Sequence, residues 1–103
     1  MDETEIARLR SQHGPDVTTM TAAGVTIAVR PPTMAEWERF QDSAADKRSK
    51  PARALAQLVR DCLVSDRAAY DAACERRPAL PTTFGSEVVK LAGLVDEVEV
   101  GKA

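Results

Sequence analysis

Aromatic residues are scarce in this sequence, and their scarcity limits the kind of core it can form. One Trp, one Tyr and two Phe account for 4% of the 103 residues. Because aromatic rings bury more area than other side chains, alanine and valine must do much of the packing here. A chain of this length is enough for one compact domain and too short for two ordinary ones. We therefore expect a single domain with a modest core and modest stability.

Residues that carry out catalysis or bind metal ions are also few. The sequence has a single histidine, His13, and two cysteines, Cys62 and Cys74. Zinc sites need more Cys and His ligands at fixed spacing, and a histidine base needs an orienting carboxylate or a nucleophile nearby. The sequence contains no phosphate-binding glycine loop and no Gly-x-Ser-x-Gly motif. We therefore expect no enzyme activity, cofactor or metal site, and we interpret the cysteines as small buried hydrophobes.

The sequence has neither a large excess of one charge nor a long apolar run. A formal net charge of -2 argues against a domain that neutralises phosphates. Basic clusters at residues 47–53 and 76–77 are interpreted as solvated faces, since the tight glycine turn of a helix-turn-helix motif is absent. No apolar run is long enough to cross a bilayer, and no signal peptide is in view. We expect a soluble cytoplasmic protein with no membrane or nucleic-acid partner.

The clearest helical pattern lies in the middle of the chain and predicts the central core helix. Its apolar residues recur at i, i+3, i+4, i+7 and i+8, namely Leu55, Leu58, Val59, Cys62 and Leu63. Pro51 suits the first turn of this helix, where a missing N–H costs nothing. An earlier helix begins with a capping-box pattern at Thr33 and Glu36. That helix places Met34, Trp37 and Phe40 on one face.

Residues 16–30 change to a period of two, which is typical of strands. Val25, Ile27 and Val29 alternate with Thr26, Ala28 and Arg30. The preceding residues are rich in threonine, and residues 22–24 can form the turn between two strands. The sequence therefore predicts a β-hairpin. Because two strands alone are marginal in water, the hairpin should pack on the helices or pair across a subunit boundary.

Shorter helical patterns account for most of the remaining chain. Residues 2–12 predict a helix with a thin apolar stripe, and Ser65 can cap a helix that ends at Arg77. Thr82 or Thr83 can cap a last helix, for which Gly93 is a good C′ residue. The tail after Gly93 alternates apolar and acidic residues through Val95, Val98 and Val100. It predicts either a frayed end or a strand that orders on a partner.

Together these elements predict an α+β fold that is mostly α, with an N-terminal β-hairpin packed on a bundle of three to four short helices. The expected organisation is an N-terminal helix in residues 1–15, loosely held or mobile, a globular domain in residues 16–94, and a C-terminal tail in residues 95–103. Self-association of the chain is left open.

The order of parts from Val25 to Gly93 resembles the small tail assembly chaperones of long-tailed phages and prophages. The resemblance rests on a strand that ends in Arg-Pro-Pro, followed by Thr-Met-Ala-Glu-Trp-Glu-Arg-Phe and then Leu-Val-Arg-Asp-Cys-Leu-Val-Ser. A short helix ending Glu-Arg-Arg-Pro-Ala-Leu and a last helix ending Lys-Leu-Ala-Gly complete it. The resemblance implies a non-catalytic protein of the bacterial host cytoplasm. Such a protein binds the tape measure protein until tail tube subunits polymerise around it.

No residue of that resemblance is a chemical site that carries over, so the expected binding surface comes from the residues alone. We expect partner binding at the hairpin, through Val25 and Ile27, and at the tail, through Val95, Val98 and Val100. One alternative is a structural adaptor of the phage particle, such as a head–tail connector component. A less favoured alternative is a small DNA-binding regulator.

Overall fold

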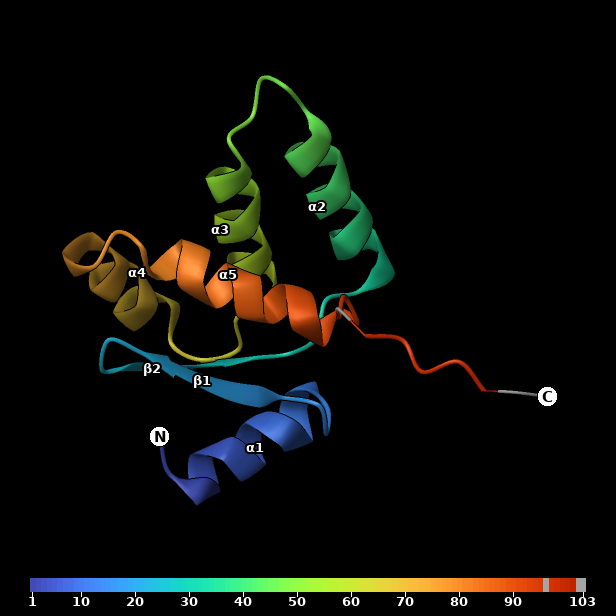
Figure 1. Cartoon of the computed structure of the whole chain (residues 1–103). Coiled ribbons are helices and arrows are strands. Elements are labelled where there is room, and N and C mark those ends of the chain that lie inside the picture. The colour runs from blue at the N-terminus through green and yellow to red at the C-terminus, as the bar shows by residue number, and fades with distance from the viewer. Residues whose placement is uncertain (96, 102–103) are drawn as a thin grey trace.

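The computed structural model describes residues 1–95 and 97–101 and has the α+β, mostly α fold that the sequence predicts (Figure 1). Its elements in chain order are α1 (Glu3–His13), β1 (Thr18–Ala22), β2 (Val25–Val29), α2 (Met34–Ala45), α3 (Pro51–Cys62), α4 (Arg67–Arg76) and α5 (Leu80–Leu91). The hairpin lies between α1 on one side and α5 on the other, and α2 and α3 stand on the far side of α5 (Figure 1). In the described residues, no helix combines the length and apolar character needed to cross a bilayer.

The predicted β-hairpin is confirmed, and its turn explains its register. β1 and β2 pair antiparallel, with Ala22 opposite Val25 and Thr18 opposite Val29. The two turn residues, Ala23 and Gly24, both have positive φ, at 50° and 76°. Positive φ at both central residues is the geometry of a type I′ turn, whose twist matches that of the two strands.

The sheet is covered on both faces, which differs from the half-buried strand expected from the alternation. Ile27 and Val29 are 2% and 0% exposed in the main core, and Ala28 between them is also 0% exposed. Ala28 is buried because α1 crosses the second face, where Leu9 and Val17 form a small separate cluster with it. The predicted N-terminal helix is therefore attached to the sheet through Leu9.

The main core lies between the sheet and helices α3, α4 and α5. It consists of Ile27, Val29, Leu58, Val59, Cys62, Tyr70, Ala73, Leu80, Phe84 and Val88. The predicted inner face of α3 supplies Leu58, Val59 and Cys62, which confirms it as a core helix. Leu63 lies just beyond the end of α3 and forms an isolated bridge with Val29. That bridge ties the segment after α3 to the outer edge of β2.

Helix ends account for two differences from the predicted boundaries. Asp66 rather than Ser65 caps α4, because its carboxylate accepts from the Ala68 and Ala69 N–H groups. The Ser65 hydroxyl instead accepts from the Ala28 N–H at 3.1 Å. α5 begins at Leu80 with Pro81 in its first turn, two or three residues before the threonines predicted to cap it. The capping box at the start of α2 is present as predicted.

Candidate functional site

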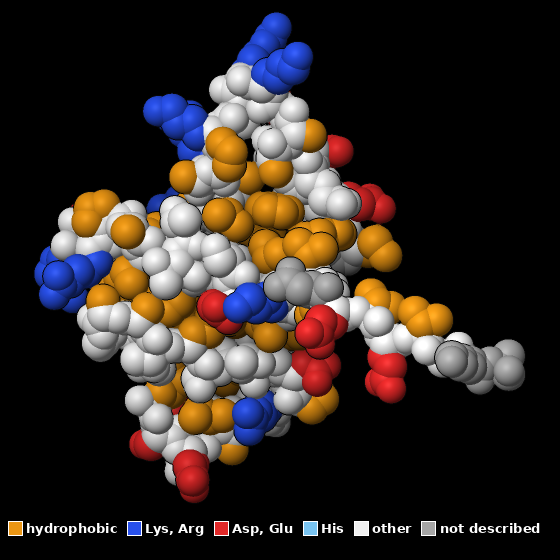
Figure 2. Space-filling view, viewed as in Figure 1, with side chains coloured by type: hydrophobic (Ala, Val, Ile, Leu, Met, Phe, Trp, Pro, Cys, Tyr) orange, Lys and Arg blue, Asp and Glu red, His pale blue; other side chains and the backbone are white. Residues whose placement is uncertain are grey.

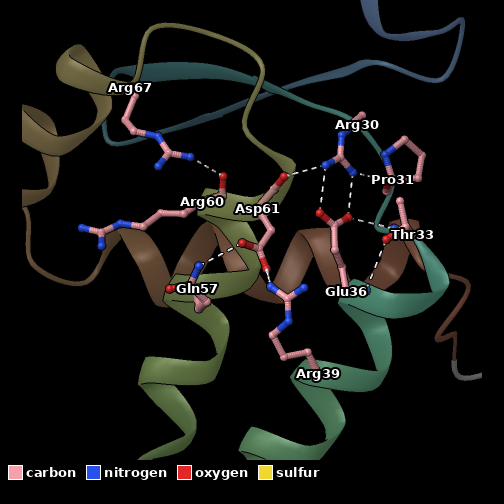
Figure 3. Close-up of polar contacts among 9 residues, drawn as sticks. All are labelled: Arg30, Pro31, Thr33, Glu36, Arg39, Gln57, Arg60, Asp61 and Arg67. Atoms are coloured by element: carbon pink, nitrogen blue, oxygen red, sulfur yellow. Dashed lines mark hydrogen bonds and ion pairs between the residues drawn. The ribbon is translucent and has the colours of Figure 1, made fainter.

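The most polar cluster in the structure lies where β2, α2 and α3 meet, and it is centred on Arg30 (Figure 3). Its guanidinium binds the Glu36 carboxylate through two hydrogen bonds, Nη1 to Oε1 at 2.7 Å and Nη2 to Oε2 at 2.9 Å. Nη2 also donates to the Asp61 carbonyl at 2.8 Å. The Asp61 carboxylate in turn accepts from Gln57 at 2.9 Å and lies 3.4 Å from Arg39. Arg30 thus joins the end of β2 to both helices.

Charge and hydrogen bonding in this cluster favour a structural joint over a reactive site. The hydrogen bonds from Arg30 lower the pKa of Glu36 to about 2, against the opposing effect of its burial. The same ion pair raises the pKa of Arg30. Each carboxylate oxygen of Glu36 has a protein donor, since Oε1 also accepts from the Thr33 N–H at 2.9 Å. Arg30 and Glu36 are therefore both charged near neutral pH.

The residues with catalytic or metal-binding potential do not come together in the described part of the chain. Cys62 is 0% exposed, and its burial raises the pKa of the thiol to about 12. Cys74 is half-buried, and His13 is exposed at the last residue of α1. Among residues 1–95 and 97–101, no group of three His, Cys, Asp or Glu side chains is arranged to hold a metal ion. The interpretation of Cys62 as a buried hydrophobe is confirmed.

An exposed apolar face on α2 is the strongest candidate for a binding surface. α2 contributes no buried residue, although the sequence places its largest side chains on one face. Met34 is 73% exposed. Trp37 is half-buried and stacks on Phe40, with ring centroids 5.2 Å apart. Figure 2 shows hydrophobic side chains gathered across the region where α2, α3 and α5 meet.

The packing of α2 explains why Met34 is exposed and Trp37 is only half-buried. α2 packs on α3, and its residues Glu36, Arg39, Phe40 and Ser43 line a small hollow between the two helices together with Leu58 and its neighbours on α3. Met34 and Trp37 point progressively away from that contact because successive i, i+3 positions drift around the helix. Sequence reasoning detected the stripe but not its exposure. One feature of the sequence could have indicated this exposure. The apolar stripe ends at Phe40, so it is too short to bury the helix along its whole length.

The residues expected to bind a partner fall into two groups. The tail valines are exposed, with Val95 at 60%, Val98 at 80% and Val100 at 82%. Val25 is half-buried and packs against the main core. Ile27 is 2% exposed within that core and offers no surface to a partner, so we remove it from the set. Its inward position follows from the alternation that identified the strand.

Comparisons with known proteins extend the description of the fold. The model of a family described as "Domain of unknown function (DUF6848)" matches residues 15–101. A solved structure described as the uncharacterised protein rbstp2171 from Bacillus stearothermophilus is similar to this chain, with a TM-score of 0.75 and 19% identity. The similarity covers 93% of this chain and 99% of that one, and at this identity it shows a shared fold. No curated protein matches the sequence.

Proposed function

The chain belongs to the DUF6848 family, whose model covers the hairpin, helices α2 to α5 and most of the tail, and we propose that it is a tail assembly chaperone of a phage or prophage. Its client is the tape measure protein, which it covers in the host cytoplasm before tail tube subunits assemble. The order of strand and helices from Val25 to Gly93, as in the small tail chaperones, supports this proposal. The function needs binding surfaces and no catalytic groups.

One observation carries the proposal: α2 presents an exposed methionine beside a half-buried tryptophan at the edge of the core. Met34 is 73% exposed, and the half-buried Trp37 stacks on Phe40, which packs against the main core. Methionine adapts its shape to different partners, and tryptophan is enriched among residues that dominate binding energy. A stripe of this kind on one helix fits an apolar stripe on a second helix.

A tape measure protein is the kind of client that needs such a surface. It is long and helical, and its apolar stripes are exposed until the tail tube encloses it. An amphipathic client helix can lie alongside α2 with its apolar side chains against Met34 and Trp37. Several copies of the chaperone along one client then cover it through many weak contacts.

Co-expression with the tape measure protein encoded in the same gene cluster tests this proposal. The wild-type chain should increase the soluble fraction of the client. Met34→Asp places a charge in the stripe and should abolish that increase. Ala35→Asp is a matched control, because Ala35 is exposed in the same turn of α2 but lies off the stripe. A negative charge in the first turn of a helix is favourable, so both aspartate variants should fold.

Two outcomes would contradict the proposal. The client may be equally soluble with and without the wild-type chain, or the two variants may act alike. Retention of the chain in purified phage particles would instead favour the structural adaptor, since a chaperone leaves before assembly is complete.

A further inference from the structure

The hairpin has one strand edge that is paired by the protein and one that is not. The outer edge of β2 is paired, because the Ala28 N–H donates to Ser65 Oγ at 3.1 Å and the Ala28 carbonyl accepts from the Val64 N–H at 2.9 Å. Thr19 lies opposite Ala28 in the register. In an antiparallel pair, two opposite residues either bond to each other or both direct their backbone groups away from the partner strand. Ala28 directs its groups outward, so Thr19 does the same at the outer edge of β1, and so does Thr21 two residues further on. In the described part of the chain, no backbone hydrogen bond reaches these groups.

A groove runs along this free edge, between β1 and α5. It has a volume of about 390 Å³ and is lined by all five residues of β1 together with Thr83, Phe84, Glu87, Lys90 and Leu91 of α5. Beyond the hairpin turn it meets a hollow lined by Arg76 and Arg77. At its other end it meets a hollow that includes Arg10. The groove is therefore lined by threonines and apolar side chains, with the Glu87–Lys90 ion pair on its α5 side. Arginines lie in the hollows at both ends, and at the Arg10 end the hollow also includes Asp16.

The C-terminal tail has the chemistry that this groove accepts. Residues 97–101 read Glu-Val-Glu-Val-Gly and have no secondary structure. In an extended conformation Val98 and Val100 share one face, while Glu97 and Glu99 share the other. Five residues in an extended conformation are enough to pair along all of β1, which has five residues. The acidic face of the segment complements Arg10, at the end of the groove where β1 begins.

We propose that residues 97–101 of one copy of this chain pair with the free edge of β1 in a second copy. The added strand bonds to the backbone of Thr19 and Thr21. It turns Val98 and Val100 toward α5, and Glu97 and Glu99 toward the face where α1 carries Arg10. Exchange in both directions produces a symmetric dimer with two three-stranded sheets. This proposal does not depend on the proposed function.

A second copy is the occupant that fits the path of the tail. α5 ends at Leu91, beside Thr18 at the start of β1, and the tail then extends away from the body of the molecule (Figure 1). Gly93, with φ of 99°, sets this direction just after the helix. The tail therefore leaves its own groove open while remaining long enough to reach a neighbour. The family match, which ends at residue 101, includes both the hairpin and this segment.

Light scattering on the full-length chain over a range of concentrations tests the proposal. The wild-type chain should form dimers, and Val98→Asp with Val100→Asp should weaken dimerisation by about tenfold or more. Both valines are at least 80% exposed in the single chain, so the substitutions should leave folding unchanged. Leu94→Asp with Val95→Asp is the control, since it adds the same charges before the pairing segment and should leave the dimer intact.

Hydrogen exchange identifies the surface that pairs. The Thr19 and Thr21 amides should be protected in the wild-type dimer and should exchange freely in the Val98→Asp/Val100→Asp variant. Three results would overturn the proposal. They are a chain that stays monomeric at all concentrations, a dimer in which both amides still exchange freely, and equal loss of the dimer in the two double variants. A monomer with protected amides would show that the tail pairs with its own β1.

Discussion

At the scale of single residues, the Arg30–Glu36 pair is the strongest polar contact between secondary-structure elements. Its two parallel hydrogen bonds form the bidentate arrangement in which arginine binds carboxylates most strongly. Both side chains are only partly exposed, at 28% and 14%. Loss of the Glu36 charge weakens the contact of β2 with α2. Arg30 then keeps its hydrogen bond to the Asp61 carbonyl but loses its carboxylate partner.

The pair makes stability depend on pH in a defined direction. The folded-state pKa of Glu36 is about 2, below the ordinary value of 4.5. A carboxyl whose pKa is lowered by folding stabilises the protein above its unfolded-state pKa and loses that effect as the pH falls toward its folded-state pKa. Glu36→Gln should therefore cost about 1–3 kcal/mol of unfolding free energy at pH 7, and much less at pH 2.

Urea denaturation at both pH values measures this difference. Glu38→Gln is the control, because Glu38 is exposed on the same helix and forms no ion pair among the described residues. A destabilisation by Glu36→Gln that is equal at pH 7 and pH 2 would show that the charge of the carboxylate contributes nothing.

The buried thiol of Cys62 should be unreactive in the folded protein. Burial raises the pKa of this thiol to about 12, and only the thiolate reacts readily with disulfide reagents. In a Cys74→Ala background, labelling by a disulfide reagent at neutral pH should be slower by about a hundredfold or more in buffer than in denaturant. Equal rates in the two conditions would contradict the burial of Cys62.

Residue-scale features were predictable where they depend on neighbours in the sequence. The Thr33–Glu36 capping box is local and was predicted correctly. The pairing of Glu36 with Arg30 was not, because it requires the end of β2 to meet the start of α2 at a fixed angle. The capping of α4 by Asp66 instead of the predicted Ser65 also depends on a contact between distant parts of the chain. The Ser65 hydroxyl is drawn to the N–H of Ala28, which is 37 residues away.

At the scale of secondary-structure elements, the closest approach is between α3 and α5 at Gly85. A Cβ atom added to Gly85 would lie 2.7 Å from the Leu55 Cβ and 3.1 Å from the Leu55 carbonyl oxygen. Because Gly85 has no side chain, the backbone of α5 can pack directly against Leu55 of α3. In isolation, alanine favours a helix over glycine by about 1 kcal/mol, so packing and intrinsic propensity oppose each other at this position.

Gly85→Ala should consequently destabilise the protein, by about 1–3 kcal/mol, despite its better helix propensity. Thermal or urea denaturation measures the change. Ser86→Ala is the matched control on the exposed side of the same helix and should change stability by less than about 0.5 kcal/mol. A stabilising effect of Gly85→Ala would mean that α3 and α5 can separate without cost.

Most elements were predictable because their patterns are periodic and their ends carry strong signals. The core face of α3 and the hairpin alternation identified both elements from the sequence. Pro81 led to a late start for α5, since proline is equally compatible with a connector and with a first helical turn. The burial of Ala28 could not be inferred from β2 itself, because it depends on α1 crossing the second face of the sheet.

At the scale of the whole molecule, two surfaces remain uncovered. α2 projects from the body of the molecule beyond α5 (Figure 1), and the groove along the free edge of β1 is lined by residues of β1 and α5. The sequence predicted the fold class but not these surfaces. Whether an apolar stripe is covered depends on how helices distant in the sequence are arranged. The tail valines were predictable as exposed because no helix or turn pattern includes them.

The face of α2 carries the central claim, and the single tryptophan of the chain lies on it. Fluorescence titration of the full chain with a tryptophan-free helical segment of the neighbouring tape measure protein tests that claim most directly. We predict that Trp37 emission shifts to shorter wavelength and saturates. Binding should weaken about tenfold or more in Met34→Asp and stay unchanged in Ala35→Asp. Emission that does not respond to the segment, or equal weakening in both variants, would contradict the account.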